Sequence, residues 1–107
     1  SLLVHVVRVG TPAYDKELHI QSSATIGRSV KADLHVDDDC VSRRHARIDV
    51  VSADRRVGLT VTHLNSANGT FLNGELVLAP QGIRQGDVVA VGNCELHVRR
   101  VGEIDSS

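Results

Sequence analysis

The sequence predicts an all-β domain, built as a sandwich or a barrel, and three observations lead to that class. Short runs dominated by valine and leucine recur along the 107 residues, and β-branched side chains favour strands. Turn dipeptides such as Asn73-Gly74 and Gly86-Asp87 separate these runs. No stretch shows a sustained apolar repeat of about 3.6 residues, so we expect no substantial helix. Many short strands at close spacing are typical of sandwiches and barrels.

Strands in the first half of the chain are expected at residues 2–9, 16–20, 24–26, 34–36 and 46–50. The first is a nearly continuous apolar run, which suits a strand covered on both faces. The run at 46–50 alternates, so Ala46, Ile48 and Val50 should face the core. An acidic loop at 37–39 precedes this strand, and a polar turn at 52–56 follows it.

Strands in the second half are expected at 57–62, 76–78, 88–91 and 94–100, with a short apolar piece at Ile83. In the last strand, Cys94, Leu96 and Val98 should share one face. Asn73-Gly74 is the dipeptide of a type I′ hairpin turn. The domain should occupy residues 1–101, followed by a frayed tail at 102–107.

The length of the chain fits one domain that can bury a core without disulfides or metals. That core must be aliphatic, because Tyr14 and Phe71 are the only aromatic residues among Phe, Tyr and Trp. The chain begins at serine rather than methionine, so we expect a monomeric module of a longer protein.

Charge and cysteine content narrow the possible partners and the compartment. The formal net charge is -1, whereas a general nucleic-acid binder is usually basic. No apolar run approaches the roughly 20 residues of a membrane span. Cys40 and Cys94 stand far apart with no signal peptide in view, so reduced thiols in an intracellular setting are expected. The composition therefore disfavours both nucleic acid and membrane as partners.

Gly27-Arg28 is the first segment that could hold an anion. Glycine frees the backbone at the end of an expected strand. The arginine guanidinium is planar and permanently charged, and it can bond two phosphate oxygens at once. A solvated surface arginine after a turn is the simpler interpretation of this pair alone.

Ser42-Arg43-Arg44-His45 is the second such segment, just before the strand at 46–50. Ser42 offers a short hydroxyl donor, and Arg43 can add a charged donor beside it. We expect Arg44 to turn outward and His45 to hold the loop by bonding to nearby backbone. A catalytic Ser42–His45 pair is the sharper alternative, but no acid partner and no Gly-x-Ser-x-Gly elbow accompany it.

Asn68-Gly69-Thr70 has three interpretations. It fits the pattern of an N-glycosylation acceptor, which matters only in a secreted protein. It also fits a plain turn, since asparagine and glycine tolerate left-handed backbone. Lastly, the turn could aim backbone N–H groups and the Asn68 amide at a ligand.

Metal binding is not expected. The six histidines are scattered, with no pair at ligand spacing and no cysteine cluster beside them. The acidic run at 37–39 lacks the glycine-centred pattern of a calcium loop. We therefore expect neither a metal nor another cofactor.

Taken in order, these segments resemble the motifs of the forkhead-associated (FHA) family. The matching residues are Gly27-Arg28, the Ser-x-x-His of 42–45, Asn68-Gly69-Thr70 and Asn73-Gly74. The strand pattern fits from about residue 2 to residue 101. The resemblance implies an eleven-stranded β-sandwich, a non-catalytic module that binds phosphothreonine peptides through loops at one end.

The resemblance also implies roles for single residues. Arg28 and Ser42 would contact the phosphate oxygens, and Arg43 would add a side-chain or backbone contact. Asn68 would bond the peptide main chain. Ala67 stands where many members carry threonine, serine or a basic residue, so only its backbone N–H remains for the ligand.

Three further residues would shape loops rather than touch the ligand, namely Gly27, His45 and Gly69, while Thr70 would start the next strand. The chemistry of phosphothreonine agrees with these residue roles. A phosphothreonine carries a charge of about -1.5 to -2 near neutral pH and three acceptor oxygens. Arginine and hydroxyl donors on loops of a rigid sandwich match that group.

Three alternatives stay open at the level of sequence. The first is a phospho-independent scaffold domain that binds a partner through a sheet face, for which Ala67 leaves room. The second is a small hydrolase that uses Ser42 and His45. The third is a nucleic-acid binder built on Arg43 and its basic neighbours, against which the near-neutral net charge argues.

Overall fold

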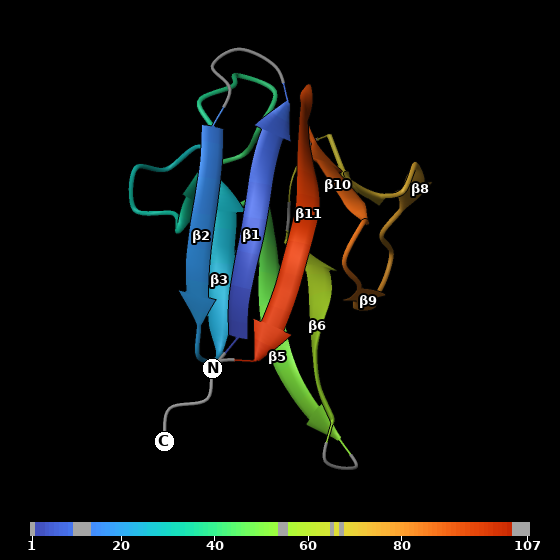
Figure 1. Ribbon diagram of the computed structural model, residues 1–107. Coiled ribbons are helices and arrows are strands. Elements are labelled where there is room, and N and C mark those ends of the chain that lie inside the picture. Colours follow the sequence, from blue (N-terminus) through green and yellow to red (C-terminus); the bar gives the residue numbers. More distant parts are fainter. Residues whose placement is uncertain (1, 10–13, 54–55, 65, 67, 104–107) are drawn as a thin grey trace.

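The computed structural model describes residues 2–9, 14–53, 56–64, 66 and 68–103. They form two β-sheets that lie face to face and contain no helix (Figure 1). No helix in this part of the chain could therefore span a membrane. The eleven strands confirm the predicted all-β class, and the two layers identify it as a sandwich rather than a barrel.

The six-stranded sheet has the order β2 (Tyr14–Ile20), β1 (Leu2–Val9), β11 (Cys94–Glu103), β10 (Val88–Val91), β7 (Thr70–Leu72) and β8 (Glu75–Leu76). The five-stranded sheet has the order β4 (Leu34–His35), β3 (Ser23–Gly27), β5 (Ala46–Ala53), β6 (Arg56–His63) and β9 (Gln81–Ile83). All neighbours pair antiparallel except β3 and β4, which are parallel.

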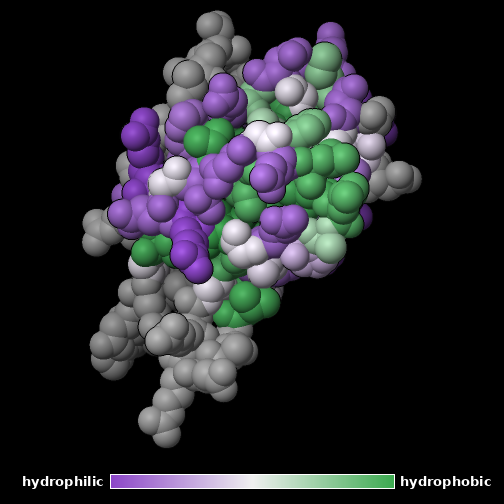
Figure 2. Space-filling model, turned by 90° about the vertical axis from the view of Figure 1, so that its right-hand side faces the viewer, coloured by the Kyte–Doolittle hydropathy of each residue, from purple (hydrophilic) through white to green (hydrophobic). Residues whose placement is uncertain are grey.

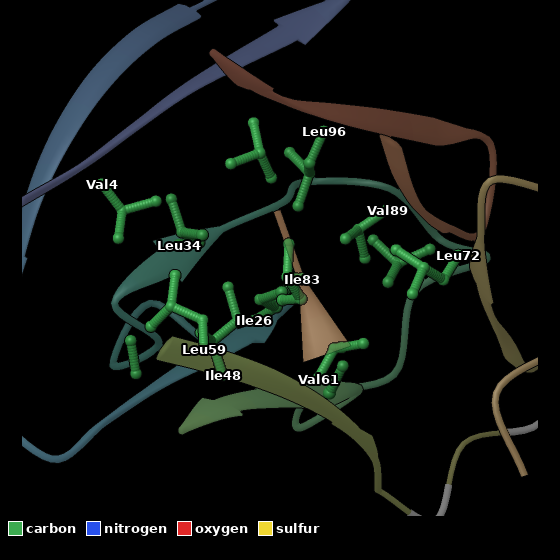
Figure 3. Packing of buried hydrophobic residues seen from close by; sticks show 14 of the residues in the cluster. Val4, Ile26, Leu34, Ile48, Leu59, Val61, Leu72, Ile83, Val89 and Leu96 are labelled. Carbon is green, nitrogen blue, oxygen red and sulfur yellow. The ribbon is translucent and has the colours of Figure 1, made fainter. Parts of the chain in front are cut away.

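The core lies between the inner faces of the two sheets. Figure 3 shows aliphatic side chains from both sheets pointing toward one another, among them Ile26, Val61 and Leu96. As predicted, Cys94, Leu96 and Val98 are all buried, and so are Ala46 and Ile48; Val50 packs partly buried against the same cluster. Burying a valine, leucine or isoleucine side chain contributes about 1.5–3 kcal/mol, so this aliphatic cluster supplies the main drive for folding.

Several strands run further than the sequence predicted, and β5 and β11 each gain three residues at one end. β5 continues to Ala53 because its hairpin partner β6 extends the ladder, with Ala53 opposite Arg56. Residues 52, 53 and 56 of the expected polar turn therefore belong to the two strands. β11 continues to Glu103, opposite Leu2 on β1, and so enters the segment expected as a tail. Residues 104–107 lie outside the described part of the chain.

The Asn73-Gly74 turn has the predicted geometry. Both residues have positive φ, 51° for Asn73 and 86° for Gly74, as a type I′ turn requires. The turn joins β7 to β8 with Leu72 opposite Glu75. Thr70 begins β7, also as expected.

Several connections meet at one end of the sandwich, at the top of Figure 1. They are the loops after β3, after β4 and after β6, and the tight turn between β10 and β11. The start of β1 and the end of β11 lie together at the opposite end (Figure 1). The loop end is therefore separated from the start of β1 and the end of β11 by the length of the sandwich.

A second surface feature lies at the edge of the six-stranded sheet. Figure 2 shows apolar residues gathered on the face that carries β8 and β9. Leu76 and Leu78 are exposed hydrophobic residues of this segment, at 45% and 85%. Val77 between them is buried, and its N–H donates to the main-chain oxygen of Thr70 at 2.8 Å.

Candidate functional site

Gly27 lets two loops touch at the end of β3. A Cβ atom at this position would lie 2.0 Å from the carbonyl oxygen of Arg43 and 3.1 Å from that of Ser42. The contact is tightened by two main-chain hydrogen bonds, from Arg28 N to Ser42 O at 3.0 Å and from Ser29 N to Arg43 O at 3.2 Å. Only glycine allows this approach, because any side chain would enter the neighbouring backbone.

Arg28 and Ser42 consequently lie side by side. The Arg28 Nε donates to the main-chain oxygen of Val41 at 3.0 Å, which anchors the guanidinium against the loop that carries Ser42. Within the described part of the chain, the Nη groups of Arg28 and the Ser42 hydroxyl make no hydrogen bond or ion pair. A cation with donors to spare is therefore fixed to the loop that carries the Ser42 hydroxyl, and donors of both kinds suit an oxyanion.

His45 connects the loop after β4 to the loop after β6. Its side chain is fully buried. Nδ1 accepts the main-chain N–H of Ser42 at 3.1 Å, and Nε2 donates to the carbonyl oxygen of Gly69 at 2.6 Å. Both bonds together require the neutral ring with its proton on Nε2. The structural role expected for His45 agrees with these contacts.

The pKa of His45 lies below its ordinary value, which favours the neutral ring. Burial is the largest cause, because a charged ring loses its solvation. The Gly69 carbonyl opposes this effect and raises the pKa, while nearby His63 lowers it further. A proton on Nδ1 would also break the bond from the Ser42 N–H.

Asn68 holds the loop after β6 against the loop after β4. Its Nδ2 donates to the main-chain oxygen of Cys40 at 2.7 Å. Its side-chain oxygen makes no hydrogen bond to the described residues. The Asn68 amide, which the family resemblance predicts to bond the peptide main chain, thus uses its nitrogen within the protein. Its oxygen stays available to accept a peptide N–H.

Arg43 and Arg44 stand at the outer rim of this region. Both are exposed, and with Ser42 and Leu64 they line a shallow hollow of about 480 Å³. Neither guanidinium forms an ion pair within the described residues. The hollow therefore combines the Ser42 hydroxyl with two unpaired cations.

Comparison with known protein families matches residues 24–92 to the FHA domain. The chain belongs to the FHA domain family. The matched segment contains Gly27, Ser42 and Gly69, and it includes the loops after β3, after β4 and after β6.

Individual FHA domains and relatives resemble the chain over most of its length. A structure solved in a study of phosphothreonine-dependent FHA domain interactions has a TM-score of 0.77 at 30% identity, covering 92% of this chain and 96% of its own. The FhaA FHA domain complexed with the intracellular domain of Rv3910 has a TM-score of 0.76 at 30% identity, covering 90% and 99%. The oxoglutarate dehydrogenase inhibitor of Corynebacterium glutamicum is 34% identical over 91 residues, 85% of this chain but 60% of the relative.

The chain thus spans less than two thirds of that curated relative. One expected contact of the FHA site cannot be placed, because Ala67 lies outside the described residues. Across the residues that are described, no three His, Cys, Asp or Glu side chains come together as metal ligands.

A hydroxyl and imidazole network behind this FHA site was not anticipated from the sequence. Ser66 Oγ accepts the Gly69 N–H at 3.2 Å and lies 3.2 Å from His45 Nε2. His63 Nδ1 lies 3.1 Å from the hydroxyl of buried Thr70, and the His45 and His63 rings pack edge to face. Ser66 and Gly69 are only three residues apart, and the tendency of serine to bond nearby backbone is the one signal the sequence offered.

Asp38 has a structural role that the expected acidic loop did not predict. One carboxylate oxygen accepts the N–H of Cys40 at 2.8 Å, and the other accepts that of Asn93 at 3.2 Å. The turn at Gly92 packs closely here, since a Cβ would lie 2.8 Å from a Val41 methyl. The β10–β11 turn therefore braces the segment whose Val41 carbonyl anchors Arg28.

Proposed function

We propose that the domain binds phosphothreonine peptides at its loop end, with Arg28, Ser42 and Arg43 holding the phosphate. The observation that carries this proposal is the guanidinium of Arg28, which is anchored at the Val41 carbonyl on the loop that carries Ser42. Asn68, and the backbone of Ala67, would hold the peptide main chain. The study of phosphothreonine-dependent interactions that produced the similar FHA structure supports the same ligand.

The proposed function is non-catalytic. Hydrolysis by Ser42 would need a base that accepts the hydroxyl proton. In His45, Nδ1 is taken by the backbone N–H of Ser42 and Nε2 by the carbonyl oxygen of Gly69. Neither ring nitrogen is left for that step, which supports a binding module over the hydrolase alternative.

The setting we propose is intracellular, as a module of a longer protein. Cys40 and Cys94 are not joined in a disulfide, which is the usual state of cysteine in reducing compartments. The curated relative is longer than this chain, which is consistent with a module that acts together with other segments.

Replacement of Arg28 tests the function. The change Arg28→Ala should weaken binding to a degenerate phosphothreonine peptide library at least tenfold, because a charge-assisted bond to phosphate is worth about 1.5–3 kcal/mol. Fluorescence anisotropy measures the affinity. Arg47→Ala is the matched control, since Arg47 pairs with Asp49 on the face of β5.

Equal affinity of the wild type and the Arg28→Ala variant, with both proteins folded, would refute the phosphate site. Binding that survives dephosphorylation of the peptide would instead favour the phospho-independent scaffold alternative. A phosphoserine library run in parallel determines whether the threonine methyl group contributes.

A further inference from the structure

We infer that a second anion-binding subsite adjoins the proposed phosphothreonine site and takes an acidic or phosphorylated side chain of the same peptide. The inference rests on the proposed function and adds the chemistry of a flanking residue. Its basis is a separate hollow of about 310 Å³ between the loop after β3 and the loop after β4. It is lined by Thr25, Ser29, Lys31, Ala32, Arg43 and Arg44.

The charge of this hollow is positive. Lys31, Arg43 and Arg44 are exposed, and none of them forms an ion pair within the described residues. One carboxylate, that of Asp33, bonds a lining residue by accepting the N–H of Thr25 at 2.9 Å, and it does not itself line the hollow. Three cations near one carboxylate leave an excess of positive charge in a chain whose formal net charge is -1.

The hollow also offers a neutral donor. Ser29 Oγ accepts the main-chain N–H of Lys31 at 3.1 Å, which fixes the hydroxyl and leaves its own proton free to donate. Because the Ser29 N–H is tied to the Arg43 carbonyl at 3.2 Å, the hydroxyl is held beside the arginine loop. A carboxylate or phosphate oxygen can therefore meet a hydroxyl and guanidinium donors together.

The two hollows are neighbours, because Arg43 and Arg44 line both of them. A peptide with its phosphothreonine at Ser42 needs only to cross these two arginines to reach Lys31. Once the phosphothreonine is bound, the second contact is intramolecular and adds affinity without a second loss of translational freedom. The basic hollow thus favours peptides that carry an additional anion near the phosphothreonine.

The test uses one phosphothreonine peptide with neutral flanking residues and two scanned series. Glutamate replaces each flanking residue in turn in the first series, and phosphoserine does so in the second, so the arms separate a carboxylate from a second phosphate. We expect a gain of about three- to fivefold at one or two positions for glutamate, the range of an exposed ion pair. The gain for phosphoserine should be larger, because it carries more charge.

The variant Lys31→Glu should abolish the gain from either anion, while its affinity for the neutral-flank peptide stays within about twofold of the wild type. It should also acquire a preference for lysine at the same peptide position. Arg99→Glu on β11 is the matched control, because it changes net charge by the same amount on the other sheet. This control should keep the preference for acidic flanks.

Three outcomes would overturn the inference. In the first, an acidic residue raises the affinity at no peptide position. In the second, Lys31→Glu keeps the full gain in affinity. In the third, Arg99→Glu loses the gain as completely as Lys31→Glu does. In each of these cases the neutral-flank peptide still binds, so the proposed function stands. If the wild-type domain binds no phosphopeptide, both the second subsite and the proposed function are refuted.

Discussion

Gly27 is the residue on which the geometry of the site depends most directly. Its Cα faces the carbonyl groups of Ser42 and Arg43 at a distance that leaves no room for a methyl group. Arg28 follows it in the chain and is bonded to the same loop. A single hydrogen atom in place of a side chain therefore decides whether the segments that carry Arg28 and Ser42 can lie against each other.

We predict that Gly27→Ala displaces the loop that carries Ser42. Stability should fall by about 1–3 kcal/mol, as is usual for overpacking a tight contact, and peptide affinity should fall at least tenfold. Urea denaturation and fluorescence anisotropy measure the two effects. Gly58→Ala is the control, because nothing lies within 4 Å of the Cβ it would add. Unchanged binding by a folded Gly27→Ala protein would show that Gly27 does not position the loop that carries Ser42.

His45 links the protonation of one ring to the stability of the fold. Its pKa is lowered in the folded protein, chiefly by burial, relative to about 6.5 in the unfolded chain. The unfolded chain therefore takes up the proton first as the pH falls. The stability that comes from the neutral ring is complete above pH 6.5 and is lost progressively below it, down to the folded pKa.

We predict that His45→Gln flattens part of this pH dependence. The free energy of unfolding, measured by urea denaturation from about pH 7.5 to pH 5, should fall less steeply for the variant than for the wild type. The other titrating groups are common to both proteins and cancel in the comparison. Parallel curves would show that His45 does not carry the linkage.

At the scale of elements, the site is a meeting of loops rather than a property of one strand. Asn68 bonds Cys40 across 28 positions of sequence, and Asn93 bonds Asp38 across 55. Such contacts give the loop after β4 the rigidity that a preorganised ligand site requires, since ordering a loop on binding would cost affinity.

We predict that Asp38→Ala loosens this loop. The change removes two accepted N–H bonds, from Cys40 and Asn93, so stability should fall by about 1–3 kcal/mol. Peptide affinity should fall as well, because Val41 no longer holds Arg28 in a fixed place. Asp37→Ala is the matched control, since exposed Asp37 makes no such bond within the described residues. Equal effects of the two changes would exclude a bracing role for Asp38.

At the scale of the whole molecule, the parts that could be predicted are those encoded in short stretches. Alternation placed Cys94, Leu96 and Val98 on one buried face, and the Asn73-Gly74 dipeptide determined its turn. The extra length of β11 depends on β1, at the other end of the chain. No local pattern could reveal that pairing.

The same distinction applies to the site. Gly27-Arg28 and the Ser-x-x-His segment could be recognised because each motif is contiguous. The dual hydrogen bonding of His45 and the bracing by Asp38 join residues from separate loops, and they depend on how the two sheets bring those loops together. The positive hollow around Lys31 likewise becomes visible only when the loops after β3 and β4 lie in place.

We propose that a phosphothreonine rests between the Arg28 guanidinium and the Ser42 hydroxyl. Titration of the ¹⁵N-labelled domain with a phosphothreonine peptide tests it most directly, by the shifts of its backbone amide signals. We predict that the largest shifts fall on Arg28, Ser42, Arg43 and Asn68, and that the unphosphorylated peptide produces none of them. Shifts confined to the exposed segment around Leu76 and Leu78, or identical for both peptides, would contradict it.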